Sequence, residues 1–422
     1  MHLFHLLCRW MRLLSIFVRA AHGAQRSKRL PAYRLLRCAP CAARKYQRIV
    51  SACLGLLFLL TSLGCSSKAT PEPVWIGQLL PLEGSNRTLA QHARQGVEQA
   101  VAESREAGYN IAGRPFAVLH ADSRDDAAAV QAETVRLVTV NKAVALLADF
   151  DATLTERLIR SSRPYGVPVI VPGELPEPPE SDAIVVLGVP PAVRGRMLAR
   201  YASADLKCRR AAVLTDSRRP VAAALAAAFV KAWPRDHDGA VEEWTFTTAA
   251  ERDERVARLI QAAPTIIVLA CSVADFRMLR PRLGSALQKV PLIYGGEDAG
   301  TTALQADLET HSDVYLATAY SAEKLSDSGR AFAGRYKERF HEPPDFFAAQ
   351  SYDATRLLFD ALQRAGAPSR DALGKTLSHM EQFDSVTGPI RWKDRLPRRR
   401  VFLIALKNNK PSVVSVLEPD EN

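Results

Sequence analysis

Short apolar runs and amphipathic stretches alternate along the chain from residue 74 onward. Runs rich in β-branched and apolar residues, such as Val74 to Leu80, predict buried strands. Between these runs, apolar residues return every three or four positions, as at Leu89, Ala93 and Val97, which predicts amphipathic helices. Strands that alternate with helices indicate βαβ units, and therefore parallel sheets with helices on both faces.

The alternation forms two successive sets, separated by Pro190 and Pro191. The first set has predicted strands at 74–80, 116–121, 143–148, 167–171 and 184–187, and helices at 89–108, 125–140 and 151–165. The second has strands at 211–215, 241–246, 265–270, 291–294 and 314–319, and helices at 194–202, 221–233, 251–262, 275–287 and 301–308. We therefore predict an α/β fold of two doubly wound parallel-sheet lobes. In such sheets ligands bind in the cleft at the carboxyl ends of the strands.

The C-terminal part departs from this alternation. Helices are predicted at 329–340 and 346–366, with another that begins near Arg370. The segments 388–392, 401–407 and 412–417 then read as short antiparallel strands, with turns at Lys393-Asp394 and Asn408-Asn409.

A different pattern precedes the lobes. The segment 49–65 is uncharged and apolar, follows Arg44, Lys45 and Arg48, and ends on Gly64-Cys65. It has 16 positions before Cys65, fewer than the roughly 20 of a membrane-spanning helix, so we interpret residues 1–64 as a leader with a signal peptide. The sequence 61–65, TSLGC, resembles the lipobox of bacterial lipoproteins, with Ser62 and Leu63 in the reverse of the usual order. This resemblance implies a lipidated Cys65 followed by a tether at 65–73. An ordinary signal peptide or an uncleaved anchor is the alternative.

Charge and cysteine content refine the picture. The leader holds eleven Lys and Arg and no acidic residue, which leaves 45 basic and 45 acidic residues after it and a formal net charge of zero. Nucleic-acid binding through bulk charge is therefore not expected. After Cys65 the chain keeps Cys208 and Cys271, each beside an apolar strand, and we expect them to be unpaired.

Several motifs resemble one protein family. Residues 76–84, IGQLLPLEG, resemble the opening of the type 1 periplasmic solute-binding proteins, in their leucine/isoleucine/valine-binding branch. Further motifs of that family match at 96–107 with 113–115, at 165–170, at 350–366 and at 383–392, in the family's order. The resemblance implies two lobes joined by three crossovers that close on a small ligand and deliver it to an ATP-driven permease. The lobes would comprise 74–189 plus 320–386 and 190–319 plus 387–422.

The resemblance also implies where a ligand would bind, and the chain departs from the family there. Amino-acid binders hold the ligand carboxylate with hydroxyls and backbone N–H groups after the third strand; the matching stretch here, 148–153, brings acids, and only Thr153 keeps a hydroxyl. Glu297, after Gly295-Gly296, matches the acid that holds the ligand ammonium. The candidate ligand-binding residues are Glu83, Asp151, Thr153, Glu174, Ser272 and Glu297. Two structural alternatives stay open, with Asp151 as a helix N-cap and Glu174 as a solvated loop acid.

The acids suggest a ligand class. If several of Glu83, Asp149, Asp151, Glu174 and Glu297 face the cleft, a cationic or neutral ligand such as a polyamine or an amide would be favoured over an amino-acid carboxylate.

These features favour a binding protein over an enzyme. After the leader the chain has none of the common nucleophile, zinc or nucleotide motifs, and its histidines lack metal-ligand spacing, so neither catalysis nor a cofactor nor a metal is expected. We predict a lipid-anchored receptor of the cell envelope, on its periplasmic or extracellular face, that captures an amino-acid-like, amide or cationic solute for an ABC permease. The alternative is a regulator or sensor that binds an envelope protein and transports nothing.

Overall fold

The computed structural model describes residues 71–84, 86–234, 240–304 and 313–419, all of which belong to a unit that runs from Pro71 to Asn422. The predicted leader, Cys65 and most of the tether lie outside the described residues. Among the described helices, none is long and apolar enough to cross a membrane.

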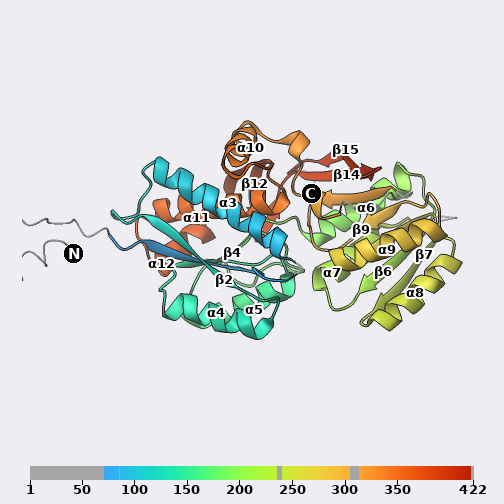
Figure 1. Cartoon of the computed structure of the whole chain (residues 1–422), viewed down its shortest axis with the longest axis horizontal. Helices are drawn as coiled ribbons and strands as arrows, with labels where there is room; N and C mark the ends of the chain where they lie inside the picture. The colour runs from blue at the N-terminus through green and yellow to red at the C-terminus, as the bar shows by residue number, and fades with distance from the viewer. Residues whose placement is uncertain (1–70, 85, 235–239, 305–312, 420–422) are drawn as a thin grey trace, which may run out of the picture. The chain divides into compact units, whose positions relative to one another are not determined.

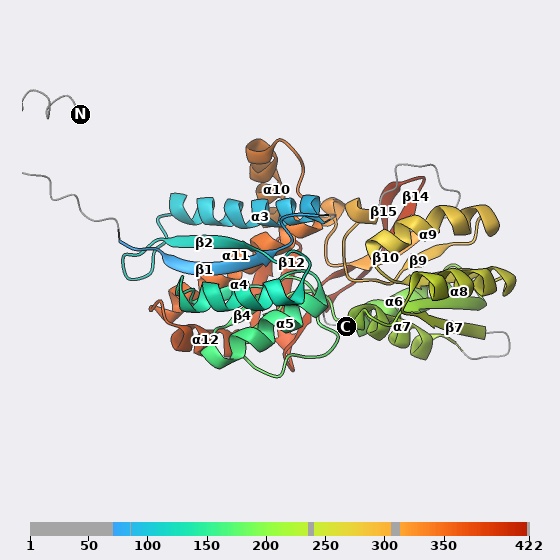
Figure 2. The same ribbon diagram turned by 60° about the horizontal axis from the view of Figure 1, so that its bottom comes forward.

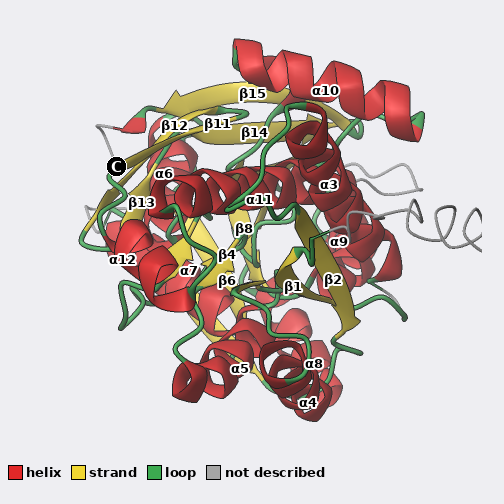
Figure 3. Ribbon diagram, turned by 90° about the vertical axis from the view of Figure 1, so that its left-hand side faces the viewer, coloured by secondary structure: helices red, strands yellow, loops and turns green. Residues whose placement is uncertain are grey.

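The first lobe is built on a parallel sheet of five strands in the order β2-β1-β3-β4-β5. The strands are β1 (Val74–Leu80), β2 (Phe116–Asp122), β3 (Ala145–Leu147), β4 (Val169–Val171) and β5 (Ile184–Val186). The helices are α3 (Arg87–Glu106), α4 (Ala127–Thr139), α5 (Ala152–Ser162), which runs into the 3₁₀ turn η1 (Arg163–Tyr165), α11 (Phe346–Ala365) and α12 (Arg370–Ser378). Figures 2 and 3 show the strands between a layer with α3 and α11 and a layer with α4 and α5.

The second lobe is built on a seven-stranded sheet in the order β15-β14-β10-β9-β8-β6-β7. Its parallel strands are β6 (Arg210–Asp216), β7 (Ala240–Phe246), β8 (Ile266–Ala270), β9 (Leu292–Tyr294) and β10 (Val314–Thr318); β14 (Val401–Lys407) and β15 (Lys410–Leu417) are antiparallel. Its helices are α6 (Pro191–Ala204), α7 (Pro220–Ala232), α8 (Ala249–Gln261) and α9 (Val273–Ala286). Figure 1 shows these helices grouped around the second sheet. The predicted fold class of two α/β lobes with parallel sheets is confirmed.

The chain passes between the two sheets three times, before α6, after β10 and before β14. The first and the last of these connections are tied together by a buried side chain, Arg399, which lies in the last one. Its guanidinium donates to the Leu187 carbonyl in the first connection at 2.7 Å and to Thr387 Oγ1 at 3.0 Å. The first and last connections are therefore hydrogen-bonded to each other.

The structure differs from the predicted elements at two places. The predicted helix 301–308 is a single 3₁₀ turn, η2 (Thr302–Leu304), and residues 305–308 lie outside the described part. The strand predicted at 388–392 is β12 (Gly388–Lys393), which pairs in a separate antiparallel sheet with β11 (Gln382–Ser385) and β13 (Leu396–Arg398), two short strands that were not predicted. The predicted lobe boundary at residue 387 falls in the turn between β11 and β12.

Helix α11 packs directly on α3, and Gly96 makes the close approach possible. A Cβ at Gly96 would lie 2.1 Å from the backbone carbonyl oxygen of Ala348, so no side chain fits there without moving one helix. Gly334, in the middle of the neighbouring helix α10 (Asp327–Phe340), has nothing within 4 Å of such a Cβ.

We expect Gly96→Ala to lower the free energy of unfolding by about 1–3 kcal/mol, because the added methyl group overpacks a helix contact made by backbone. The matched Gly334→Ala should raise it by about 0.5–1 kcal/mol, since alanine is the better residue inside an open helix. Urea unfolding followed by circular dichroism measures both. Equal stability of Gly96→Ala and the wild type would contradict the close approach.

Candidate functional site

A cavity of about 570 Å³ lies where carboxyl ends of strands from both lobes meet. From the first lobe it is lined by Leu80, Pro81, Asn86, Thr88, Leu89, Ala90, His92, Asp125, Asp149, Phe150, Asp151 and Phe347. From the second lobe it is lined by Arg219, Ser272, Val273, Ala274, Arg277, Tyr294, Glu297, Asp298, Ala299, Thr302 and Ala303. Most of these residues follow a strand end or open a helix, as expected for parallel α/β sheets.

One wall of the cavity is aromatic. Phe150, just after β3, lies edge-on to Phe347 and Phe346 in the first turn of α11, with ring centroids 4.8 and 5.8 Å apart. Both Phe346 and Phe347 are buried. Because these rings support one another, the wall presents a fixed apolar surface to the cavity.

Arg219 connects the two lobes across the cavity. It precedes α7, and its Nη1 lies 3.1 Å from Glu297 Oε1 on its own lobe and 3.4 Å from Asp151 Oδ2 on the other. Burial alone would lower the pKa of the Arg219 guanidinium, but Glu297 and Asp151 outweigh it and raise that pKa. Arg219 therefore stays charged and neutralises part of the acidic lining.

Asp149 is buried beside Asp151. Its carboxylate accepts hydrogen bonds from the backbone N–H groups of Phe150 at 2.6 Å and Asp151 at 3.2 Å, and from Ser123 Oγ at 3.1 Å. Burial raises the pKa of Asp149 to about 7 in spite of these donors. Its oxygens are thus used in shaping the loop that presents Phe150 and Asp151.

A buried ion pair contacts the segment that carries the lining residue Glu297. Glu174 of the first lobe and Arg194 of α6 are 3% and 0% exposed, and Arg194 Nη1 donates to both Glu174 oxygens at 2.8 and 3.0 Å. Arg194 also donates to the carbonyls of Gly296 and Ala317, and Glu174 accepts from the backbone N–H of Asp298 at 3.1 Å. The pair therefore holds the 296–298 segment, and with it Glu297, in place.

The predicted site residues separate into three groups. Asp151, Ser272 and Glu297 line the cavity, whereas Glu83 and Thr153 are exposed and are not among the lining residues. Glu174 is not among the lining residues and is buried in its ion pair with Arg194. The alternative interpretation of Glu174 as a solvated loop acid is therefore wrong. These placements leave the ligand-binding roles as predictions.

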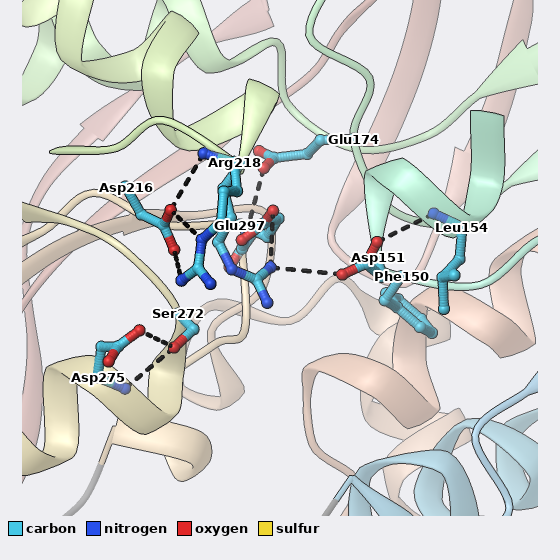
Figure 4. Close-up of polar contacts among 12 residues, drawn as sticks. Phe150, Asp151, Leu154, Glu174, Asp216, Arg218, Ser272, Asp275 and Glu297 are labelled. Atoms are coloured by element: carbon cyan, nitrogen blue, oxygen red, sulfur yellow. Dashed lines mark hydrogen bonds and ion pairs between the residues drawn. The ribbon is translucent and has the colours of Figure 1, made fainter. Parts of the chain in front are cut away.

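Helix caps explain two of the lining residues. Asp151 accepts from the Leu154 N–H at the start of α5 (Figure 4), as the N-cap alternative predicted. Its second oxygen faces Arg219. Ser272 caps α9 by accepting from the Asp275 N–H at 3.0 Å, and it donates to the Asp275 carboxylate at 2.8 Å.

The glycines before Glu297 act within the protein core. A Cβ on Gly296 would lie 2.2 Å from the carbonyl oxygen of Cys271, the residue that follows β8. The backbone of Gly296 therefore packs closely against the backbone at the end of β8. Cys271 and Cys208 are both free and buried, which confirms the expectation that they are unpaired.

Sequence reasoning missed the cations and rings of the site, namely Arg219, Arg277, Phe150 and Phe347. Arg219 could have been found by the rule that pointed to Glu297, since it also lies between a strand end and a helix. Phe347 could not have been found from the sequence. It lies in the first turn of α11, and α11 lies at the cavity only because the chain crosses back to the first lobe after β10.

The acidic-cleft hypothesis required several of five acids to face the cleft. Asp149, Asp151 and Glu297 line the cavity, whereas Glu83 and Glu174 do not. Asp151 and Glu297 also contact Arg219, which offsets part of their charge.

A second hollow of about 790 Å³ lies on the first lobe between α3, α11 and β11. It shares no lining residue with the interlobe cavity. Within its lining Arg364 forms an ion pair with Asp360, and the lining residues come from the first lobe and the three-stranded sheet. We therefore take the interlobe cavity as the candidate site.

Comparison with known proteins agrees with the fold. A family model described as "Periplasmic binding protein" matches residues 73–411. The chain matches no curated protein sequence. A leucine-binding protein of Thermotoga maritima is 17% identical, with a TM-score of 0.73, over 83% of this chain and 100% of that one. A branched-chain amino acid transporter substrate-binding protein of Streptococcus pneumoniae, solved with isoleucine, is 20% identical, with a TM-score of 0.72, over 82% and 100%.

A third solved structure carries a different ligand. The solute-binding protein of an ABC transporter from R. palustris, in complex with benzoate, is 19% identical, with a TM-score of 0.68. It covers 82% of this chain and 97% of its own. At such identities the likeness concerns the fold alone.

We expect Arg194→Met to lower the free energy of unfolding by about 3–5 kcal/mol, because it leaves the Glu174 carboxylate buried without its cation. The double variant Arg194→Met with Glu174→Gln should recover part of this loss, since the uncompensated charge is gone. Arg258→Met removes an exposed ion pair with Glu254 on α8 and should cost at most about 1 kcal/mol. Denaturant unfolding measures all three, and a loss for Arg194→Met no larger than for Arg258→Met would contradict the supporting role.

The raised pKa of Asp149 predicts a pH dependence of stability. Between about pH 4 and about pH 7 the folded protein retains a proton that the unfolded chain releases, so the free energy of unfolding falls as pH rises. The Asp149→Asn variant lacks this group, so its free energy of unfolding should fall less steeply with pH than that of the wild type. The two slopes should differ by up to about 1.4 kcal/mol per pH unit. Thermal unfolding across this range, with the exposed Asp371→Asn as control, measures the slopes. Parallel slopes for wild type and Asp149→Asn would contradict the prediction.

Proposed function

The chain belongs to the periplasmic binding protein family, and we propose that it is an extracytoplasmic receptor that captures a small solute between its lobes and passes it to an ABC permease. The observation that carries this proposal is a cavity of about 570 Å³ that needs both lobes to complete its lining. A cavity of this size suits a small molecule. Because both lobes contribute to the lining, a bound ligand would contact both and would favour the arrangement of the lobes that closes around it. Binding, without catalysis or a cofactor, is all that this role requires.

The proposed receptor is held at the membrane by its N-terminus. We propose that Cys65 carries the lipid and that the lobes lie on the periplasmic or extracellular face of the cell envelope. The support is the sequence itself, with a basic flank, an apolar segment and TSLGC in the right order. Each acyl chain contributes about 0.8 kcal/mol per buried CH₂, so two or more chains hold a protein on a membrane stably.

The sequence suggested amino-acid-like, amide or cationic ligands. The solved neighbours were crystallised with isoleucine in one case and with benzoate in another. The lining of this cavity, with its aromatic wall and its paired charges, supports a small solute with an apolar body and a polar end.

We expect the full chain, purified in detergent, to be stabilised by at least one member of a panel of amino acids, amides, polyamines and small carboxylic acids. A ligand at 100 times its dissociation constant stabilises by about 2.7 kcal/mol, which a thermal-shift assay detects. Ala274→Trp places a large ring in the cavity and should abolish the shift, whereas Ala257→Trp on the exposed face of α8 should keep it.

Silence across the whole panel would contradict the receptor proposal. It would favour the alternative of a regulator or sensor that recognises an envelope protein. A shift that survives Ala274→Trp unchanged would contradict the proposed cavity.

A further inference from the structure

We propose that the cavity takes an apolar-bodied carboxylic acid without an ammonium group, and that Arg219 binds its carboxylate. This inference rests on the proposed receptor function and adds the ligand class. It concerns Arg219, whose ion pairs with Asp151 and Glu297 reach both lobes.

Arg219 is held at one corner only. Both of its ion pairs, with Glu297 Oε1 at 3.1 Å and with Asp151 Oδ2 at 3.4 Å, use Nη1. Within the described part of the chain, its Nε and Nη2 have no hydrogen-bond partner, and the side chain is 30% exposed and lines the cavity. A guanidinium presents its donors in a planar fork, and this remaining edge matches the two oxygens of a carboxylate.

The Arg219 guanidinium already occupies the position at Glu297 where a ligand ammonium would bind. Glu297, the residue that the sequence suggested as the ammonium anchor, is 15% exposed at its side chain and faces the Arg219 guanidinium. A ligand ammonium would have to displace a cation that is covalently part of the chain and lies between two carboxylates. The tethered cation therefore disfavours ligands that rely on an ammonium group.

Five acids of the described residues line the cavity, and a carboxylate at the Nε and Nη2 edge of Arg219 is favoured because that edge carries the guanidinium charge. Asp125 accepts a hydrogen bond from Asn86 Nδ2 at 3.2 Å. Asp149 and Asp298 are buried and accept hydrogen bonds from the protein, Asp298 from the backbone N–H groups of Gly300 at 3.0 Å and Ala319 at 2.7 Å. Asp151 and Glu297 lie at the Nη1 corner, and a carboxylate on the Nε and Nη2 edge would have the guanidinium charge nearest to it.

The walls suit an apolar body beside that carboxylate. Phe150, Phe347 and Leu89 line the cavity from the first lobe, and Val273, Ala274 and Ala299 line it from the second. An acid with an aromatic or aliphatic body would bury its apolar part between these walls and turn its charged end to Arg219.

Four related probes separate the possible ligand classes. They are 3-phenylpropionate, its amide, 3-phenylpropylamine and phenylalanine, which differs from 3-phenylpropionate by the ammonium group alone. Isothermal titration calorimetry on the full chain in detergent should give the tightest binding for 3-phenylpropionate, by at least about tenfold over each of the other three. Tighter binding of the amine or of phenylalanine would overturn the proposal.

Variants then assign the carboxylate to Arg219. Arg219→Met should weaken 3-phenylpropionate binding by about 10- to 100-fold, and Arg219→Lys should fall between, because lysine keeps the charge but loses the fork. The neighbouring Arg218 is paired with Asp216 and does not line the cavity, so Arg218→Met is the matched control and should bind as the wild type does.

Glu297→Gln gives a readout that does not depend on how well Arg219→Met folds. If Arg219 binds the carboxylate, removing the Glu297 charge should leave 3-phenylpropionate binding unchanged or tighter. A tenfold or larger loss would overturn the proposal.

Failure of this inference can be told from failure of the proposed function. If none of the four probes binds while an amino acid or a polyamine of the thermal-shift panel does, the receptor function stands and the carboxylate assignment is wrong. If nothing binds in either experiment, both are wrong.

Discussion

A carboxylate of the first lobe and a guanidinium of the second, Glu174 and Arg194, meet where almost no water reaches them. Removing two charges from water is costly, and the cost is offset here by direct contact and by further donors and acceptors from the backbone. Those backbone partners belong to Gly296 and Asp298, on either side of Glu297. The position of the cavity's acidic residue relative to the first lobe therefore depends on this ion pair.

The same principle governs the cavity above it. Acids outnumber arginines among the lining residues, yet the electrostatic character of the site follows from their contacts and not from their number. Asp149 shapes its own loop, Asp298 is held by backbone N–H groups, and Asp151 and Glu297 share one corner of Arg219. The same lining also holds an aromatic wall and the outer edge of the Arg219 guanidinium.

The fold and the site of this chain depend on different residues. Identities of 17–20% to solved binding proteins accompany TM-scores of 0.68–0.73, because alternating buried strands and amphipathic helices specify the lobes through many interchangeable apolar side chains. A site depends on a few polar side chains, and here the acids after β3 and Arg219 before α7 set the charges that line the cavity. What the protein binds therefore depends on these residues and not on the fold alone.

The sequence alone determined the elements whose signal is local. β1 and β14 lie where their apolar runs predicted them, and the N-cap role of Asp151 followed from its place before a helix. The two-lobe class followed as well, since it needs only the alternation of elements.

Contacts between distant residues were decided by the tertiary structure alone. Arg219 meets partners 68 and 78 positions away, Glu174 finds Arg194 across a lobe connection, and β11 and β13 are stable only because they pair with β12. A charged residue reads as solvated in a sequence because its neighbours along the chain are polar. Whether it is buried, paired or facing a ligand depends on which other strand end the fold brings beside it, and that juxtaposition exists only once both lobes are packed.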